Sequence, residues 1–188
     1  KNDFHYYGDK TFNASVFMTP GTPRQTHFDD GGFNFLQNTL NLDLSRSFSS
    51  IAQGLNLGLG AEYRYEHYGI YAGEEASYKS YFTGDLFYPN VNESRAPAAG
   101  AQGFPGFTPS DAIKAHRSNI SIYADGELNI TKAWLADAAI RFENYSDFGS
   151  VLTFKFATRY KVASNFNIRG SVSTGFRAPS LQQINFSN

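Results

Sequence analysis

Cysteine is absent from the sequence, and its absence excludes disulfide bonds, thiolate metal sites and cysteine nucleophiles together. Charge is scarce as well: Asp, Glu, Lys and Arg make up 18% of the 188 residues, which is low for a surface that faces water. The 16 basic residues nearly cancel the 17 acidic ones, so the composition gives no sign of nucleic-acid or polyanion binding. No apolar run reaches the roughly 18 residues of a transmembrane helix, and the mean hydropathy of -0.41 excludes a helical membrane protein. The opening KNDFHYYGDK lacks the basic start and apolar core of a signal peptide, so we expect a mature protein or a fragment.

Aromatic residues and glycine are abundant, with 18 Phe, 12 Tyr and 17 Gly, a composition that suits strands and turns better than helices. Apolar residues recur at every second position along most of the chain, as they do in strands with two unlike faces. In LNLGLGAEYRYEHY, for example, Leu55, Leu57 and Leu59 alternate with an asparagine and two glycines. This period predicts an all-β antiparallel meander of about eight long strands. The expected strands cover 2–8, 11–18, 39–48, 55–68, 118–130, 134–143, 152–162 and 166–177.

The lengths of the strands and of their connections favour a membrane barrel over a soluble sandwich. Several strands run for about 11 to 15 residues, twice the usual strand length and enough for a tilted membrane crossing of roughly 9 to 11 residues. Short turns on one rim and long loops on the other are typical of outer-membrane barrels. Short turns are expected at 49–53, 131–133 and 163–165, and longer connections at 19–33, 69–116 and 145–150.

The two faces of the expected strands differ in chemistry. Aromatic residues gather near strand ends, where a girdle at the lipid boundary would lie, at Phe48, Tyr63, Tyr65, Trp134, Phe142 and Phe176. The polar face carries both signs of charge, as a wet lumen or a surface against an internal plug requires, at Asp43, Glu62, Arg64, Glu66, Asp125, Glu127, Arg141, Lys155, Arg159 and Arg169. The same residues could instead form the solvated side of a soluble sheet.

Several segments resemble the barrels of TonB-dependent outer-membrane receptors, of the kind common in Bacteroidetes. The segment STGFRAPSLQQ is similar to a strand and loop of these barrels, and RFENYSDFGSVLTFKFATRYKVASNFNIRGSVS looks like the two strands that lead into it. Upstream, GAEYRYEHYGIYAGEEASY and AAGAQGFPGFTPSD look like a strand and an extracellular loop. The resemblance is strong over 55–188 and extends to the rest.

The resemblance implies a transmembrane barrel of about 22 strands, closed by an internal plug, in the outer membrane of a bacterium. Such receptors bind a scarce nutrient, which can be an iron chelate, haem, cobalamin or a glycan, and import it with energy passed from TonB. The implied partners are therefore TonB, the plug domain, outer-membrane lipid and the nutrient, without nucleic acid and without a cofactor.

The chain also departs from a whole receptor. It has no segment like the plug or the TonB box, and it ends in INFSN instead of a terminal aromatic strand. We therefore expect residues 1–188 to be a central excerpt of the barrel, with the plug domain and the C-terminal strands absent. The excerpt alone would not transport, and we expect it to self-associate through its apolar face.

The long extracellular-type loop at 69–116 provides the candidate ligand-binding residues, because connections longer than about 15 residues are usually functional or disordered. These candidates are Arg95, Gln102, Phe104, Phe107 and Asp111, a mixture of rings and polar groups suited to gripping a ligand. A disordered or partner-packed loop is the alternative. In GFRAPS, we expect Phe176, Arg177 and Pro179 to shape the following loop or to contact the plug.

Other motifs give no site. The four histidines, His5, His27, His67 and His116, share no metal-ligand spacing. HFDDGG lacks the alternating ligands of a calcium loop, and we interpret it as a tight turn. No catalytic arrangement is present, so we expect no enzyme and no metal site. The remaining alternative to a transport receptor is a soluble β-sandwich module that binds a ligand such as a carbohydrate; the connection lengths and the resemblance both favour transport.

Overall fold

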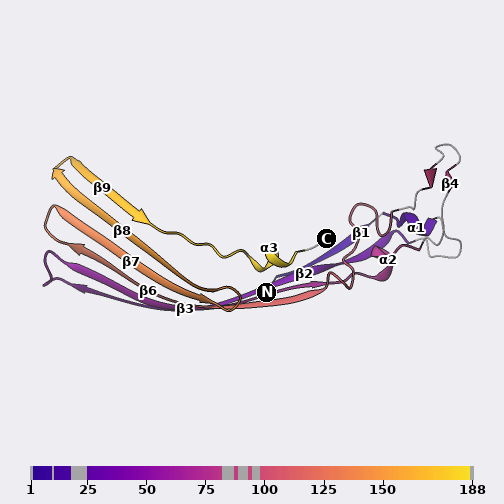
Figure 1. The fold of residues 1–188 in the computed structure, drawn as a ribbon, viewed down its shortest axis with the longest axis horizontal. Helices are drawn as coiled ribbons and strands as arrows, with labels where there is room; N and C mark the ends of the chain where they lie inside the picture. Colours follow the sequence, from indigo (N-terminus) through magenta and orange to yellow (C-terminus); the bar gives the residue numbers. More distant parts are fainter. Residues whose placement is uncertain are drawn as a thin grey trace. The chain divides into compact units, whose positions relative to one another are not determined.

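The structure is a computed structural model that describes residues 2–9, 11–17, 25–81, 87–88, 93–94 and 98–186. Seven strands form one antiparallel sheet in the order β1, β2, β3, β6, β7, β8, β9, so neighbours in the sheet follow one another along the chain (Figure 1). This arrangement confirms the predicted all-β meander. The strands are β1 (Asn2–Asp9), β2 (His27–Phe48), β3 (Leu55–Tyr71), β6 (Ile113–Asn129), β7 (Trp134–Tyr145), β8 (Gly149–Ala163) and β9 (Phe166–Ser173).

Short elements lie in the connections. β4 (Phe87–Tyr88) and β5 (Glu93–Ser94) pair with each other as a separate two-stranded sheet. Three helices, α1 (Ala14–Phe17), α2 (Glu75–Tyr78) and α3 (Leu181–Asn185), have only four or five residues each. Among the described residues, no helix is both long and apolar enough to cross a bilayer.

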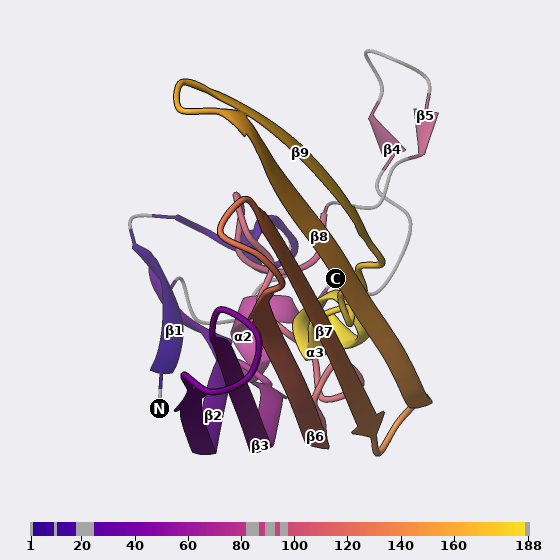
Figure 2. The same cartoon turned by 90° about the vertical axis from the view of Figure 1, so that its left-hand side faces the viewer.

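The chain divides into two compact units. Unit 1 comprises Lys1–Leu36, His67–His116 and Leu181–Asn188, and unit 2 comprises Gln37–Glu66 and Arg117–Ser180. In unit 1, a hydrophobic core forms around Tyr68, Ile70, Phe107 and Leu181, each at most 4% exposed. Unit 2 contains all of β7, β8 and β9, which lie side by side (Figure 2).

The strand predicted over 11–18 is wrong. Residues Ala14–Phe17 form the helical turn α1, and only an isolated bridge pairs Asn13 with Ala101. The Asn13 side chain explains the difference, because its Oδ1 accepts hydrogen bonds from the Ser15 N–H at 3.1 Å and from the Ser15 hydroxyl at 2.6 Å. Such local side-chain bonds stabilise a helix start over an extended strand.

The segment HFDDGG is not a tight turn either, because it lies within β2. Tyr6 of β1 pairs with Gly31 and Tyr7 pairs with Asp29, so Asp30 is left without a partner on β1 as a β-bulge. Gly31 has a φ of 77°, which only glycine adopts readily. Because β2 begins at His27, the long connection predicted over 19–33 ends earlier.

Three further boundaries differ from the expectation. Tyr145 pairs with Gly149, so the connection between β7 and β8 is a tight turn at 146–148 instead of a longer loop, and Gly149 has a φ of 92°. β9 ends at Ser173, so Phe176, Arg177 and Pro179 lie in the segment between β9 and α3. The connection predicted at 69–116 is shorter than expected, because β3 runs to Tyr71 and β6 begins at Ile113.

Unit 2 places its apolar side chains outside and its polar side chains inside. Leu40, Leu42 and Leu44 of β2 are 72%, 61% and 61% exposed. On β6 the outward residues Ile120 and Ile122 are likewise exposed, whereas the neighbouring Asn119 and Ser121 of the opposite face are buried. We call the face with the exposed leucines and isoleucines the outer face, and the face with the alternating polar residues the inner face. A soluble sandwich requires the opposite arrangement.

Candidate functional site

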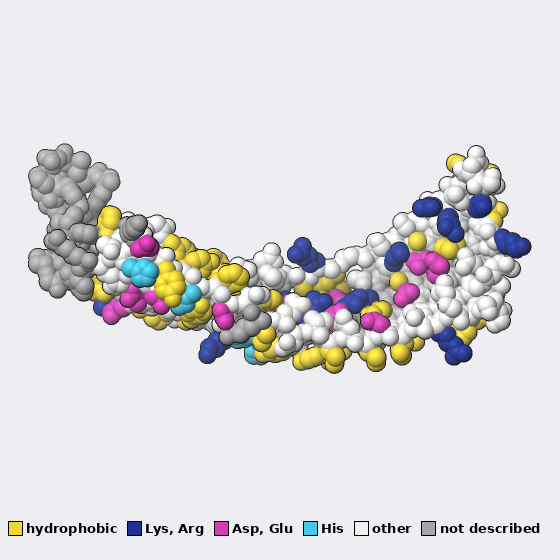
Figure 3. All heavy atoms as spheres, turned by 180° about the vertical axis from the view of Figure 1, so that it is seen from behind, with side chains coloured by type: hydrophobic (Ala, Val, Ile, Leu, Met, Phe, Trp, Pro, Cys, Tyr) yellow, Lys and Arg dark blue, Asp and Glu magenta, His cyan; other side chains and the backbone are white. Residues whose placement is uncertain are grey.

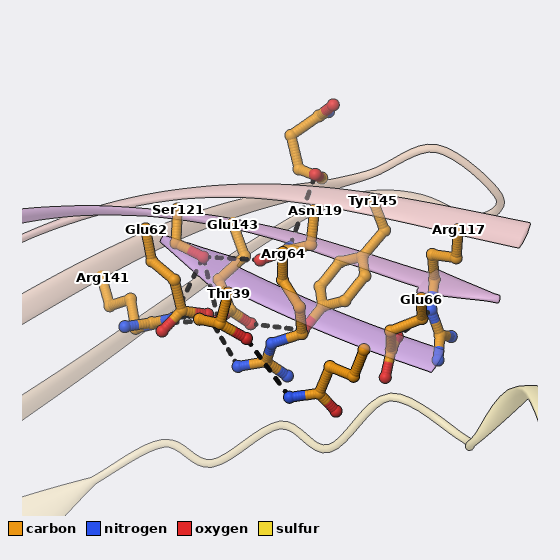
Figure 4. A network of polar contacts seen from close by, with 12 residues as sticks. Thr39, Glu62, Arg64, Glu66, Arg117, Asn119, Ser121, Arg141, Glu143 and Tyr145 are labelled. Atoms are coloured by element: carbon orange, nitrogen blue, oxygen red, sulfur yellow. Dashed lines mark hydrogen bonds and ion pairs between the residues drawn. The ribbon is translucent and has the colours of Figure 1, made fainter. Parts of the chain in front are cut away.

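The inner face of unit 2 carries a buried polar strip on β6. Arg117, Asn119 and Ser121 are 2%, 2% and 0% exposed, and each points to the same side because strand residues alternate. The Ser121 hydroxyl donates to Asn119 Oδ1 at 2.7 Å, and Asn119 Nδ2 donates to the Asn144 carbonyl of β7 at 3.4 Å. The strip is the centre of the network in Figure 4, which joins side chains of several strands.

Arg117 connects three parts of unit 2. Its Nε donates to Glu66 Oε2 of β3 at 3.0 Å, its Nη1 lies 3.3 Å from Asp147 Oδ2 in the β7–β8 turn, and Nη1 also donates to the Pro179 carbonyl at 2.9 Å. The guanidinium lies 5.7 Å from the Tyr145 ring centroid. A buried charge needs such compensation, and here the compensation fastens the 174–180 segment to the strands.

A second group of ion pairs joins β3, β6 and β7. Arg141 Nε donates to Glu143 Oε1 at 2.7 Å, and its Nη2 donates to the Ser121 hydroxyl at 3.0 Å and lies 3.5 Å from Glu62 Oε1. Arg64 Nη2 donates to the same Glu62 oxygen at 2.7 Å. Glu62 is thus shared between two guanidinium groups, so both signs of charge interlock as the sequence predicts for a lumen wall.

Glycines on β3 allow inner-face side chains of β6 to lie across the sheet. A Cβ at Gly60 would overlap the Tyr123 ring, and a Cβ at Gly58 would overlap the Asp125 carboxylate. Tyr123 lies across Gly60, and its hydroxyl donates to Asp43 of β2. β3 therefore needs glycine at position 60, because a side chain there would displace the Tyr123 ring.

Figure 3 shows Lys, Arg, Asp and Glu side chains interspersed over the inner face of unit 2, whereas hydrophobic side chains line the opposite edge. The comparison with known families agrees with this geometry. The family model "TonB dependent receptor-like, beta-barrel" matches residues 1–188. The chain belongs to this family of TonB-dependent receptors. No curated protein and no solved structure matches it.

Membership confirms the family expected from STGFRAPSLQQ and its neighbours, and with it a transport receptor of the bacterial outer membrane. Receptors of this family are transporters, and they work with a plug domain and TonB. The Bacteroidetes origin stays a prediction, since the family match names no bacterial group. The soluble sandwich is not favoured by the family or by the exposed leucines.

The structure places the loop candidates of this TonB-dependent receptor in different surroundings. Phe107 is fully buried in the core of unit 1, and Phe104 packs edge-on against it at 5.5 Å between centroids. Asp111 holds a turn, because its Oδ2 accepts from the Thr108 N–H at 2.8 Å. Gln102 is partly exposed, and its Nε2 donates to the Gly100 carbonyl at 3.3 Å. Arg95 lies outside the described residues. Ligand binding by these five residues stays a prediction.

The GFRAPS residues lie near the Arg117 network. Phe176 packs against Phe148 at 5.5 Å between ring centroids, and the Pro179 carbonyl is the acceptor for Arg117. Arg177 is exposed. Sequence reasoning missed Arg117, because the predicted strand began at 118. Extending the period of two from Asn119 back to Ile113 would have placed Arg117 on the inner face.

One further group is notable in unit 1, at the β-bulge. Asp30 is 2% exposed, and its Oδ1 has no hydrogen-bond partner among the residues that the structure describes. Burial, together with the neighbouring carboxylates of Asp29 and Glu74, raises the pKa of Asp30 to about 6. Asp30 precedes Leu40, the first of the exposed leucines, by ten residues and is outside that apolar segment. Within the described ranges, no group of three or more His, Asp or Glu residues is arranged to hold a metal ion.

Proposed function

We propose that residues 1–188 are a central part of the barrel wall of a receptor that binds a scarce nutrient outside the cell and imports it in a TonB-dependent way. The inverted distribution of side chains in unit 2, with exposed leucines and a buried Arg117, is the observation that carries the proposal. Seven strands are too few to close a receptor barrel of about 22 strands. The excerpt alone is therefore not transport-competent.

Within the receptor, the nutrient contacts the loop between β3 and β6. Gln102 and Phe104 supply an amide and a ring that are only partly buried, which suits direct contact with a ligand. Arg95 adds a positive charge in the same loop. The packing of Phe107 and the turn held by Asp111 support a role in keeping the loop in shape. The nutrient belongs to the classes that such receptors import: iron chelates, haem, cobalamin or glycans.

Phe176, Arg177 and Pro179 shape the segment that follows β9. The support for this role is the ring contact of Phe176 and the hydrogen bond that Arg117 donates to the Pro179 carbonyl. All three side chains are exposed, and the charge of Arg177 suits a polar contact with the plug.

A growth and binding experiment tests the proposal. The full receptor is deleted from its native bacterium and restored by plasmid, and growth is compared with each nutrient class as the limiting source. The class that requires the receptor is then titrated against purified receptor carrying Gln102→Ala or Phe104→Ala. We expect the dissociation constant to rise about tenfold, the loss of one polar or aromatic contact. Ala99→Ser, an exposed change in the same loop, is the matched control.

Two outcomes would contradict the proposal. Growth that does not depend on the receptor with any nutrient class would remove the import function. Unchanged binding by both loop variants would show that these loop residues do not contact the nutrient, and the proposed import function would still stand. A separate measurement addresses the isolated chain: sedimentation should show a dimer or larger species in buffer that becomes a monomer when a mild detergent covers the outer face.

A further inference from the structure

The β-bulge of unit 1 anchors the loop between β3 and β6. The Glu74 N–H donates to the Asp29 carbonyl at 2.8 Å, and the Phe107 N–H donates to the Asp30 carbonyl at 3.0 Å. The Gly73 N–H donates to the Phe107 carbonyl at 2.9 Å, so the two arms of the loop, 72–78 and 100–108, are bonded to each other and to the bulge. In return, the Asp29 N–H donates to Glu74 Oε1 at 3.0 Å. A movement of the bulge therefore disturbs both arms.

Contacts from β1 and from the segment after it hold the candidate ligand-binding residues of this loop. The Phe104 ring lies 5.4 Å from the Tyr6 ring of β1 and 5.5 Å from the Phe107 ring, measured between centroids. The Thr11 hydroxyl donates to the Gln102 carbonyl at 2.6 Å. Because β1 pairs with β2 across the bulge, the positions of Gln102 and Phe104 depend on how firmly the bulge is formed.

His5 of β1 joins the bulge to β3, and its hydrogen bonds require two ring protons. Its Nδ1 lies 3.2 Å from the Tyr71 hydroxyl, whose single proton is donated to the Phe4 carbonyl at 2.9 Å, so Nδ1 is the donor of that contact. Its Nε2 lies 2.6 Å from Asp29 Oδ1, a carboxylate oxygen that only accepts. Both nitrogens of histidine donate only when the imidazole is positively charged. With all three bonds formed, His5 is therefore a cation.

Asp30 also needs a proton. Its buried side chain accepts a hydrogen bond from the Gly8 N–H, but its Oδ1 has no hydrogen-bond partner among the described residues. Burial and the carboxylates of Asp29 and Glu74 raise the pKa of Asp30 to about 6. An ionised Asp30 places a further negative charge at the bulge, and a buried charge without a partner is costly.

The other charged groups around the bulge come from three elements. Those that face it are Asp29 and His27 of β2, His5 and Asp9 of β1, and Glu74 of the following loop. His27 Nδ1 lies 3.8 Å from Asp9 Oδ1. At acidic pH both histidines carry positive charge and Asp30 is neutral. At higher pH the histidines are neutral, and the carboxylates of Asp29, Asp30 and Glu74 repel one another. Protons on these groups therefore stabilise the bulge.

We propose that protons on His5 and Asp30 set how firmly the loop between β3 and β6 is anchored, so that the receptor binds its nutrient more tightly at acidic pH than at neutral pH. This inference rests on the proposed function, because it concerns the same loop. When the pH rises, His5 loses one of its two ring hydrogen bonds and Asp30 acquires a buried charge, so the arms of the loop separate from the bulge more often. A binding site that is formed for a smaller fraction of the time has a proportionally weaker apparent affinity.

Hydrogen exchange on the full receptor in detergent, without nutrient, tests the anchor. Amide protection is compared at about pH 4.5 and about pH 7.5 after correction for the intrinsic rates. In wild type, we expect 72–78 and 100–108 to lose at least about tenfold of their protection between the two, whereas 134–143 of β7 keeps its protection. The double variant His5→Gln with Asp30→Asn removes both titrating groups and should remove this loss. His116→Gln, which replaces an exposed histidine of the same unit, should leave the loss unchanged.

A titration at both pH values tests the effect on binding. Haem, cobalamin, ferric citrate and maltohexaose serve as probes, one for each nutrient class. The dissociation constant of wild type divided by that of the double variant cancels any pH dependence of the probe itself. For the probe that binds, we expect this ratio to rise about tenfold from the lower to the higher pH. No binding by any probe at either pH would count against the proposed function, while hydrogen exchange still decides the anchor.

Three results would overturn the inference. One is equal protection of 72–78 and 100–108 in wild type at the two pH values. Another is a double variant that keeps the full pH dependence, since other groups would then control the loop. The third is a ratio of dissociation constants that does not change with pH. Heat-dependent mobility on a denaturing gel reports whether each barrel is folded. If the double variant is not folded, Asp30→Asn alone should be better protected than wild type at the higher pH, and equal protection would count against the inference.

Discussion

Replacing Leu42 by arginine distinguishes a lipid-facing wall from a soluble sheet. Leu42 is 61% exposed and lies between two other exposed leucines on the outer face of β2. In water, a change at such an exposed position alters stability by about 0.5 kcal/mol or less. At the midplane of a bilayer, an arginine on the lipid face of a barrel costs about 2 to 4 kcal/mol. A lipid-facing wall and a soluble sheet therefore predict folding equilibria that differ by at least about tenfold.

The assay measures folding of the full receptor in phospholipid vesicles. Folded and unfolded barrel are separated by their heat-dependent mobility on a gel at increasing urea, and the free energy of unfolding is obtained from the midpoint. Asn41→Arg is the matched control, because Asn41 is the adjacent residue of the same strand and points to the inner face. We expect Leu42→Arg to lose about 2 to 4 kcal/mol and Asn41→Arg to lose less than about 1 kcal/mol.

Equal losses in the two variants would refute the reasoning. That result would mean that both faces of β2 meet similar surroundings, and the exposed leucines would then carry no information about lipid. A larger loss in Asn41→Arg would indicate that the inner face is the tightly packed one and would return the soluble sandwich to consideration.

Three further predictions follow from single contacts. Arg117→Met leaves the carboxylates of Glu66 and Asp147 without their cation and should destabilise the receptor by about 3 to 5 kcal/mol in urea unfolding, with faster amide exchange over 174–180; unchanged exchange over that segment would contradict the fastening role. Gly60→Val should cost about 1 to 3 kcal/mol in the same unfolding assay by displacing the Tyr123 ring, and Tyr123→Ala in the same molecule should recover part of the loss. Because the folded pKa of Asp30 is raised from 3.8 to about 6, stability near the bulge should fall as pH rises between those values. Ionisation of Asp30 costs up to about 3 kcal/mol, and Asp30→Asn should abolish the pH dependence. Amide exchange over 27–36, corrected for its intrinsic pH dependence, measures the effect. The same pH profile in wild type and in the variant would disprove the prediction.

The sequence predicted the strands in which alternation is regular and unbroken. The segments 55–68, 134–143 and 152–162 all fall within observed strands, because each has apolar residues at every second position. Local side-chain chemistry defeated the same reasoning elsewhere. Asn13 bonds to Ser15 and ends extended structure, and Asp30 of HFDDGG forms a bulge in place of a turn. Neither effect changes the hydrophobic pattern from which the strands were predicted.

The loop between β3 and β6 was recognised from its length, but the surroundings of its residues depend on contacts distant in sequence. Phe104 and Phe107 are phenylalanines of the same loop and look alike in the sequence. Of the two, only Phe107 is fully buried, in a core with Tyr68 and Leu181. The Asp111 carboxylate accepts a hydrogen bond from the hydroxyl of Thr108, three residues away. The sequence thus identifies the loop as a candidate site. Which of its residues pack in the core and which are accessible can be read only from the fold.

The pairing of Arg159 with Arg169 shows what alternation leaves open. Alternation assigns each arginine to a face, but the partner depends on register. The two-residue turn between Ala163 and Phe166 would by itself pair odd-numbered residues of β8 with even-numbered residues of β9, setting apolar side chains opposite polar ones. A register shift between Lys161 and Ala163 corrects this by one residue, so that Tyr160 pairs with Ile168 and Phe156 with Val172. The bulge that keeps the outer face apolar is therefore the same feature that sets two arginines opposite each other on the inner face.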